Sequence, residues 1–211
     1  MSTFAKRERL LLADLLETAG PEARTLCEGW LTRDLAAHVV VRERRPDAAG
    51  GMLIKQLAPR LEKVMEEYAG KPYEELIQLI RTGPPRFSPF QLKQIDEMSN
   101  TIEFYVHTED VRRAQPDWTT RELDPVFQDA LWSRLERVAR LMGRGVPTGL
   151  VLRRPDGQTA VAHRGTPVVT VTGEPSELLL FLYGRQSAAK VDVDGDAEAI
   201  TRLEESRQLG F

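Results

Sequence analysis

Residues 100–113 read NTIEFYVHTEDVRR and lie within a longer run, 91–114, whose apolar residues recur at helical spacing. Glu103 and His107 are four residues apart in this run, so their side chains lie on one face of the predicted helix. Asp110 shares that face. This polar face borders an apolar stripe made of Ile95, Ile102 and Val106. The pattern predicts a long helix whose polar side chains flank the interior of a helical bundle.

The rest of the first two thirds of the chain also has helical periodicity. Further helices are expected at residues 4–17, 32–45, 52–68, 73–81 and 125–142, with Thr32 as a plausible N-cap. The segments between them are short and contain glycine or proline, as at Gly20-Pro21. Helices joined in this way favour an antiparallel bundle.

The periodicity changes near residues 143–147. Short runs rich in β-branched residues at 150–153, 159–162, 168–172 and 191–193 predict strands, and Asp156-Gly157 predicts a hairpin turn. Helices are expected at 174–183 and after Asp196, a plausible N-cap. The predicted fold class is therefore α+β, with a helical domain at 1–145 and a small α+β domain at 146–211.

Charge, hydropathy and cysteine content exclude several classes of protein. The net charge of −3 gives no electrostatic basis for binding nucleic acid or an anionic membrane surface. No segment approaches the roughly 18–20 apolar residues that cross a bilayer. The first 17 residues do not resemble a cleavable signal peptide. The single cysteine, Cys27, cannot form an internal disulfide, which favours a reducing compartment. We therefore expect a cytoplasmic protein.

His38 occupies a position that complements the Glu103–His107 pair. Leu31, Leu35, His38 and Arg42 follow the spacing of one helical face, which turns the imidazole inward. One histidine from this helix and the pair from residues 91–114 would give three ligands, a set typical of catalytic zinc sites. The spacing alone leaves an alternative open, because a lone inward histidine is more often a core residue and a Glu-x-x-x-His pair is usually solvated.

Three segments resemble one known family. Residues 30–39, WLTRDLAAHV, resemble the entry to the second helix of DinB-like metalloenzymes, and more narrowly of the mycothiol-dependent maleylpyruvate isomerase family. Residues 100–113 resemble that family's Glu-x-x-x-His segment. Gly184-Arg185 and residues 191–196 are similar to its sterol-carrier-like C-terminal domain. The resemblance implies a DinB-like four-helix bundle followed by a small α+β sterol-carrier-like domain.

The resemblance also implies ligands and a cofactor. It makes His38, Glu103 and His107 metal ligands, usually of zinc, although nickel, iron or manganese also suits these donors. It further implies mycothiol, a small thiol whose sulfur would take the open metal position and ionise there. The chain is also similar to an actinobacterial subgroup of the family, so maleylpyruvate itself is not implied as the substrate.

The implied chemistry is a thiol-dependent isomerisation or S-transfer on a small substrate; an anionic substrate would need an arginine. Asp110 would support a ligating imidazole or act as a base; a solvent-exposed carboxylate is the alternative. Arg185 is the candidate for binding an anionic substrate, and a surface residue is the alternative. Cys27 is interpreted as a packing residue near no predicted ligand, and His163 has no partner at a useful spacing.

Two other functions remain open on the same residues. The chain could be a non-catalytic protein that binds a metal or a small ligand, or a metal-dependent hydrolase that uses bound water. A pocket over the ligands would favour an enzyme, whereas an apolar tunnel elsewhere in the C-terminal domain would favour ligand binding. Neither pattern nor resemblance specifies an oligomeric state.

Overall fold

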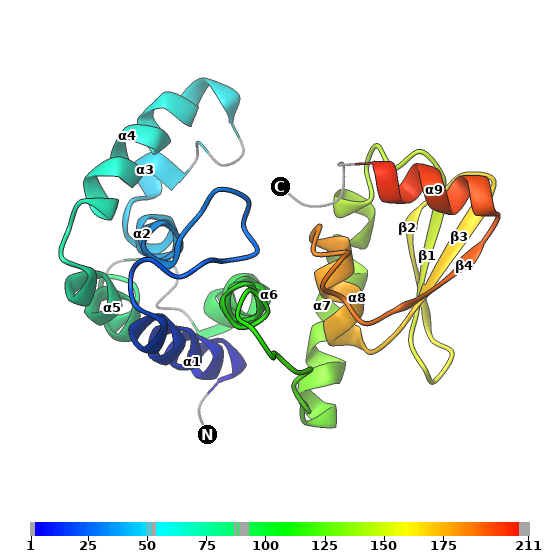
Figure 1. The fold of residues 1–211 in the computed structure, drawn as a ribbon, viewed down its shortest axis with the longest axis horizontal. Helices are drawn as coiled ribbons and strands as arrows, with labels where there is room; N and C mark the ends of the chain where they lie inside the picture. Colours follow the sequence, from blue (N-terminus) through cyan, green and yellow to red (C-terminus); the bar gives the residue numbers. More distant parts are fainter. Residues whose placement is uncertain (1–2, 50, 52–53, 87, 89–92, 207–211) are drawn as a thin grey trace. The chain divides into compact units, whose positions relative to one another are not determined.

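The computed structural model describes residues 3–49, 51, 54–86, 88 and 93–206 (Figure 1). The chain divides into two compact units, Met1–Thr119 and Thr120–Phe211, each with its own core. The first unit is helical and the second combines helices with one sheet, which confirms the α+β class expected from the sequence.

The first unit contains the predicted helices α1 (Phe4–Ala19), α2 (Thr32–Arg44), α4 (Ala58–Ala69), α5 (Tyr73–Thr82) and α6 (Lys93–Arg112). It also contains two short helices that periodicity did not predict, α3 (Pro46–Ala49) and the 3-10 helix η2 (Lys55–Leu57), which lies within the segment expected as the single helix 52–68. Thr32 is the first helical residue of α2, and Leu31 is the N-cap, its backbone N–H donating to the Asp34 carboxylate at 3.0 Å. The expected starts at residues 52 and 91 lie outside the described residues.

One apolar core joins four of these helices. α1 packs against α5 and α6, and α2 packs against α4 and α5 (Figure 1). Leu12 of α1, Leu35 of α2, Leu76 of α5 and Phe104 of α6 are all fully buried in a single cluster. This core fixes α2 and α6 close to each other, and these two helices carry His38, Glu103 and His107.

The second unit is built on a four-stranded sheet in the order β2-β1-β3-β4. The strands are β1 (Gly149–Arg153), β2 (Thr159–His163), β3 (Val168–Thr172) and β4 (Asp192–Gly195). β1 pairs with β2 as the predicted antiparallel hairpin, while β1 and β3 are parallel. Helices α7 (Pro125–Met142), α8 (Pro175–Leu182) and α9 (Ala197–Glu205) complete the unit, and Asp196 caps α9 through the Ala199 N–H.

Helix α7 begins and ends where the sequence predicts but belongs to the second unit. The sequence placed it as the last helix of the bundle, within a domain ending at residue 145. In the structure it packs against α8 and β2 instead. The two units divide between Thr119 and Thr120. Its buried face includes Phe127, Leu131 and Leu135. At its end, a Cβ on Gly143 would lie 2.5 Å from the Ala162 carbonyl oxygen, so helix and strand meet at a glycine. Periodicity identifies a buried face but not what covers it.

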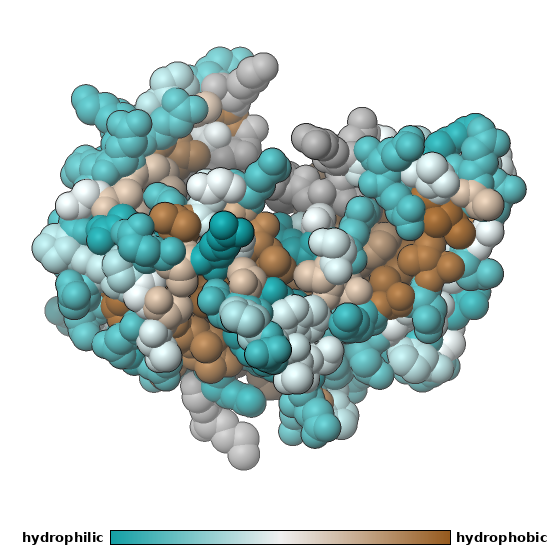
Figure 2. All heavy atoms as spheres, viewed as in Figure 1, coloured by the Kyte–Doolittle hydropathy of each residue, from teal (hydrophilic) through white to brown (hydrophobic). Residues whose placement is uncertain are grey.

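The surface of each unit is mainly hydrophilic on the face seen in Figure 2, and smaller hydrophobic patches interrupt it. Among the described helices, none combines the length and apolarity that a bilayer span needs.

Candidate metal centre

Three side chains from two helices meet within the first unit. His38 extends from α2, and Glu103 and His107 extend from successive turns of α6. The Nε2 atoms of His38 and His107 each lie 3.2 Å from the same oxygen, Oε1 of Glu103. The two imidazole rings are nearly perpendicular, with centroids 5.1 Å apart. The spacing on α6 and the inward face of α2 thus bring the three predicted ligands to one point.

These separations fit a cation shared by the three side chains. In a tetrahedral zinc site with bonds of about 2.0–2.2 Å, neighbouring nitrogen and oxygen ligands are about 3.3–3.4 Å apart. The two observed nitrogen–oxygen distances of 3.2 Å are close to that value and longer than most N–H···O hydrogen bonds. All three donor atoms lie within 4.8 Å of one another. Two imidazoles and a carboxylate suit zinc and other divalent transition metals.

A second cluster, Cys27, His107 and Asp110, also has donor atoms within 4.8 Å of one another. Its atoms are spaced for hydrogen bonds: Asp110 Oδ2 lies 2.9 Å from His107 Nδ1 and 3.2 Å from Cys27 Sγ. Cation-bridged separations would be about 3.3 and 3.6 Å. An ionised carboxylate only accepts, so the thiol and Nδ1–H donate to Asp110. Nε2 of His107 is then the nitrogen that faces Glu103.

The position of Cys27 corrects the expectation that it lies near no predicted ligand. It does pack against the apolar core, as the sequence interpretation held, but its thiol also contacts the buried Asp110. The cause is the loop between α1 and α2, which folds onto α6 through a hydrogen bond of 3.0 Å from the Leu26 N–H to the Asp110 carbonyl. The same loop places the Trp30 ring 5.1 Å from the His38 ring. Helical periodicity carries no information about this loop.

Arg42 is a further side chain at the centre that sequence reasoning did not select. Its Nε lies 3.2 Å from Glu103 Oε1, and its Nη2 donates to the Ser99 carbonyl at 3.2 Å. A third contact runs from Nη1 to Asn100 Oδ1. The sequence did contain a signal, because Arg42 follows His38 by four residues on the same predicted face.

Burial and neighbouring charges set the protonation of the centre. Burial favours a raised pKa for Glu103, but the Arg42 charge and the two histidine contacts hold that pKa well below its usual value. Burial lowers the pKa of His38. Burial opposes protonation of His107 as well, yet hydrogen bonds to Asp110, Cys27 and Glu103 raise its pKa well above the usual value. A metal ion would therefore have to displace a proton from His107.

A buried polar network continues from Arg42 to α1. Asn100 is fully buried and donates from Nδ2 to Glu43 at 3.1 Å and to Asp96 at 2.7 Å. Arg9 of α1 donates to the same two carboxylates, at 2.7 and 3.0 Å. Burial raises the pKa of Glu43 to about 7, although the charges of Arg9 and Arg42 oppose this shift. The network ties three helices together beside the centre.

The structure places Arg185 and His163 in the second unit. Arg185 follows α8; its backbone N–H donates to the Leu180 carbonyl at 2.9 Å, and its Nη1 donates to the Tyr183 carbonyl at 2.5 Å. His163 ends β2 and lines a shallow cavity of about 340 Å³ together with Arg140 and Arg164. Asp110, by contrast, lies in the first unit and is fully buried, so the solvent-exposed alternative for it is wrong.

Fold and donor set together define an α+β protein whose helical N-terminal unit carries a candidate centre of two histidines and one glutamate. Two solved structures share this fold. One is a histidine-to-alanine mutant of mycothiol-dependent maleylpyruvate isomerase, with a TM-score of 0.58 and 17% identity over 92% of this chain and 96% of that chain. The other is mycothiol-dependent maleylpyruvate isomerase itself, with a TM-score of 0.50, 16% identity and the same coverage.

These likenesses confirm at the level of the fold the resemblance that the sequence motifs indicated. No family model matches the chain, and no curated protein sequence matches it.

Proposed function

We propose that this chain is a divalent-metal enzyme, with zinc as the natural metal, that works with a low-molecular-weight thiol of the mycothiol kind. The reaction would be an isomerisation or an S-transfer on a small anionic substrate. The observation that carries the proposal is the convergence of His38 Nε2 and His107 Nε2 on Glu103 Oε1, each at 3.2 Å. The names of the two solved structures that share the fold support the choice of thiol and reaction class.

The chain's own residues would divide the work as follows. His38, Glu103 and His107 would hold the metal, and the metal would favour ionisation of a coordinated thiol. Asp110 would fix the His107 ring through Nδ1. Because Asp110 is buried and already accepts from two donors, it is better suited to holding the imidazole than to acting as a base. Arg185 would bind the anionic group of the substrate, since a guanidinium pairs with a carboxylate through two parallel hydrogen bonds.

Metal analysis of the purified protein tests the first part of this proposal. Wild type should carry one equivalent of zinc, and His38→Ala and His107→Ala should lose it. The third histidine provides the control, because His163 lies in the second unit, and His163→Ala should keep its metal. Wild type that binds no stoichiometric metal would contradict the proposal.

Titration of the cobalt-substituted protein with mycothiol tests the thiol. Coordination of sulfur should produce a thiolate-to-cobalt charge-transfer band, whereas an unchanged spectrum would remove the thiol and leave water-based hydrolysis as the stronger alternative. Arg185→Ala tests the substrate role, with an expected rise in KM for an anionic substrate and little change in metal content. An unchanged KM would contradict that role.

A further inference from the structure

Glu103 Oε1 has three nitrogen neighbours. His38 Nε2, His107 Nε2 and Arg42 Nε each lie 3.2 Å from it. A carboxylate oxygen offers about two lone-pair positions, so it cannot accept three good hydrogen bonds at once. A cation held by the three ligands would remove this excess of donors around Oε1, because both Nε2 lone pairs would then point at the metal. Of the three neighbours, Arg42 alone would remain paired directly with Glu103, as an ion pair.

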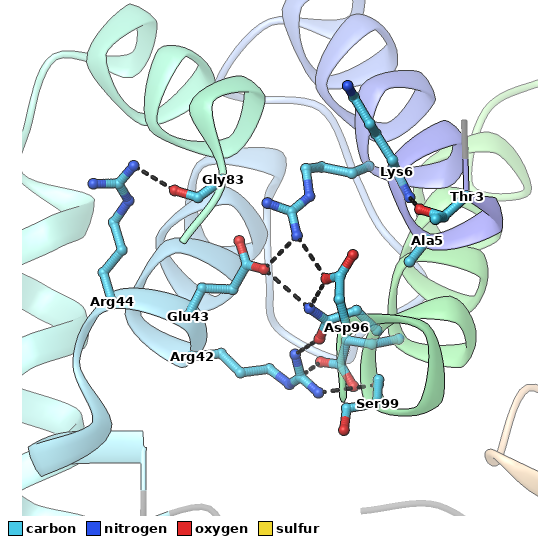
Figure 3. A network of polar contacts seen from close by, with 12 residues as sticks. Thr3, Ala5, Lys6, Arg42, Glu43, Arg44, Gly83, Asp96 and Ser99 are labelled. Carbon is cyan, nitrogen blue, oxygen red and sulfur yellow. Dashed lines mark hydrogen bonds and ion pairs between the residues drawn. The ribbon is translucent and has the colours of Figure 1, made fainter. Parts of the chain in front are cut away.

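The Arg42 side chain is itself held in place by α6. Its Nη2 donates to the Ser99 carbonyl, and its Nη1 donates to Asn100 Oδ1. Figure 3 shows Arg42 extending from α2 toward Ser99 on α6. The orientation of Asn100 is fixed in turn, because its Nδ2 donates to Glu43 and Asp96. The planar guanidinium therefore reaches Glu103 from a rigid, mostly buried support.

We infer that Arg42 is a positioning residue of the metal centre, whose guanidinium holds Glu103 Oε1 toward the two histidine Nε2 atoms through the Nε–Oε1 ion pair. This inference rests on the proposed metal site. Arg42 could act on metal affinity in two opposite ways. Its positive charge repels a cation, while its ion pair with Glu103 orients the ligand. Mutating a residue that directly supports a ligating group typically costs about 10–100-fold in metal affinity, and the rigid support of Arg42 favours this orienting effect.

Two substitutions separate charge from orientation. Arg42→Lys keeps the charge but lacks the planar fork that spans Glu103, Asn100 and the Ser99 carbonyl. Arg42→Gln removes the charge as well. Zinc affinity of the full chain would be measured by competition with a chromophoric chelator. We expect both variants to bind zinc about 10–100-fold more weakly than wild type.

Arg44 provides a matched control on the same helix. It also donates to backbone carbonyls, those of Leu79 and Gly83, but these lie on and just after α5 (Figure 3). Arg44→Lys should therefore keep wild-type zinc affinity even if it lowers the melting temperature. Thermal unfolding of all variants in excess chelator measures the stability cost separately from metal binding.

Each result decides the role of Arg42. Wild-type affinity in Arg42→Lys, or tighter binding in Arg42→Gln, would overturn the inference and show that the residue acts through its charge or not at all. Loss of folding in both variants would assign Arg42 to bundle stability and overturn it too. Wild type that binds no zinc would defeat the proposed metal site itself. Wild type that binds zinc, with unaffected variants, would defeat this inference alone.

Discussion

Single side chains at the centre depend on contacts from several helices and one loop. Asp110 illustrates this, because it is fully buried and lies within hydrogen-bonding distance of His107 Nδ1 and Cys27 Sγ. A carboxylate paired to a ligating imidazole fixes the ring and increases its basicity. Neither effect requires Asp110 to touch the metal.

Asp110→Asn should weaken zinc binding by about 10–100-fold, because an amide oxygen accepts from Nδ1–H more weakly than a carboxylate. The measurement is chelator competition on the full chain. Asp156→Asn is the control, since Asp156 lies exposed in the β1–β2 turn and contacts Gln158 and Arg154 of the same turn. Equal zinc affinity of wild type and Asp110→Asn would show that this hydrogen bond is irrelevant to the metal.

Part of this arrangement could be predicted from the sequence. The spacing of Glu103, His107 and Asp110 fixes their common face, and the structure does bring them together with His38. Their roles as ligands and support stay predictions. Cys27 and Arg42 could not be placed in the same way, because one sits on a loop and the other interacts across helices. Such contacts are set by tertiary packing, which local periodicity does not encode.

At the scale of helices, α1 allows a comparison of two leucines. Leu12 is fully buried in the core of the first unit, while Leu10, half a turn away, is 37% exposed. Leu12→Ala should lower the free energy of unfolding by about 2–5 kcal/mol, because a cavity remains where the side chain packed. Leu10→Ala should change the free energy of unfolding by about 0.5 kcal/mol or less. Urea denaturation of both variants checks this, and equal losses would contradict the assigned face of α1.

Glu43 on α2 should make stability depend on pH. Burial raises its pKa from 4.5 to about 7, so the folded state holds a proton that the unfolded chain releases between those values. The contribution of Glu43 to the free energy of unfolding should therefore fall as pH rises from about 4.5 to 7. Glu43→Gln lacks this pH-dependent contribution. The free energy of unfolding of wild type should therefore fall by about 1–3 kcal/mol relative to that of the variant between pH 4.5 and 7.

Urea unfolding of wild type and Glu43→Gln at several pH values gives this difference. A difference that stays constant from pH 4.5 to 7 would mean that the ion pair with Arg9 keeps Glu43 ionised throughout.

Element boundaries were predicted better than element partners. α7 and the strands of the second unit begin and end within a residue or two of their expected positions, because proline, glycine and β-branched runs mark them locally. The partner of α7 was missed, because an amphipathic helix packs equally well on helices or on a sheet. Only the three-dimensional structure shows that α8 and β2 cover its apolar face.

The division of the whole molecule gives a prediction about fragments. A fragment of residues 120–211 keeps α7 on the sheet, whereas one of residues 146–211 loses the buried Phe127, Leu131 and Leu135. We expect the longer fragment to unfold cooperatively and the shorter one to lack a cooperative transition, since burial of each large apolar side chain contributes about 1.5–3 kcal/mol. Circular dichroism during heating compares them, and a cooperative transition in 146–211 would support the boundary at residue 145.

The contact between Cys27 and Asp110 gives the protein a built-in reporter. Because the chain has one cysteine, a thiol-specific reagent labels one position without any engineering. That position touches the carboxylate that also holds His107. The rate of labelling should therefore change whenever a bound ion or cofactor alters these contacts, and mass spectrometry can follow occupancy of the centre in unpurified extracts as readily as in pure protein.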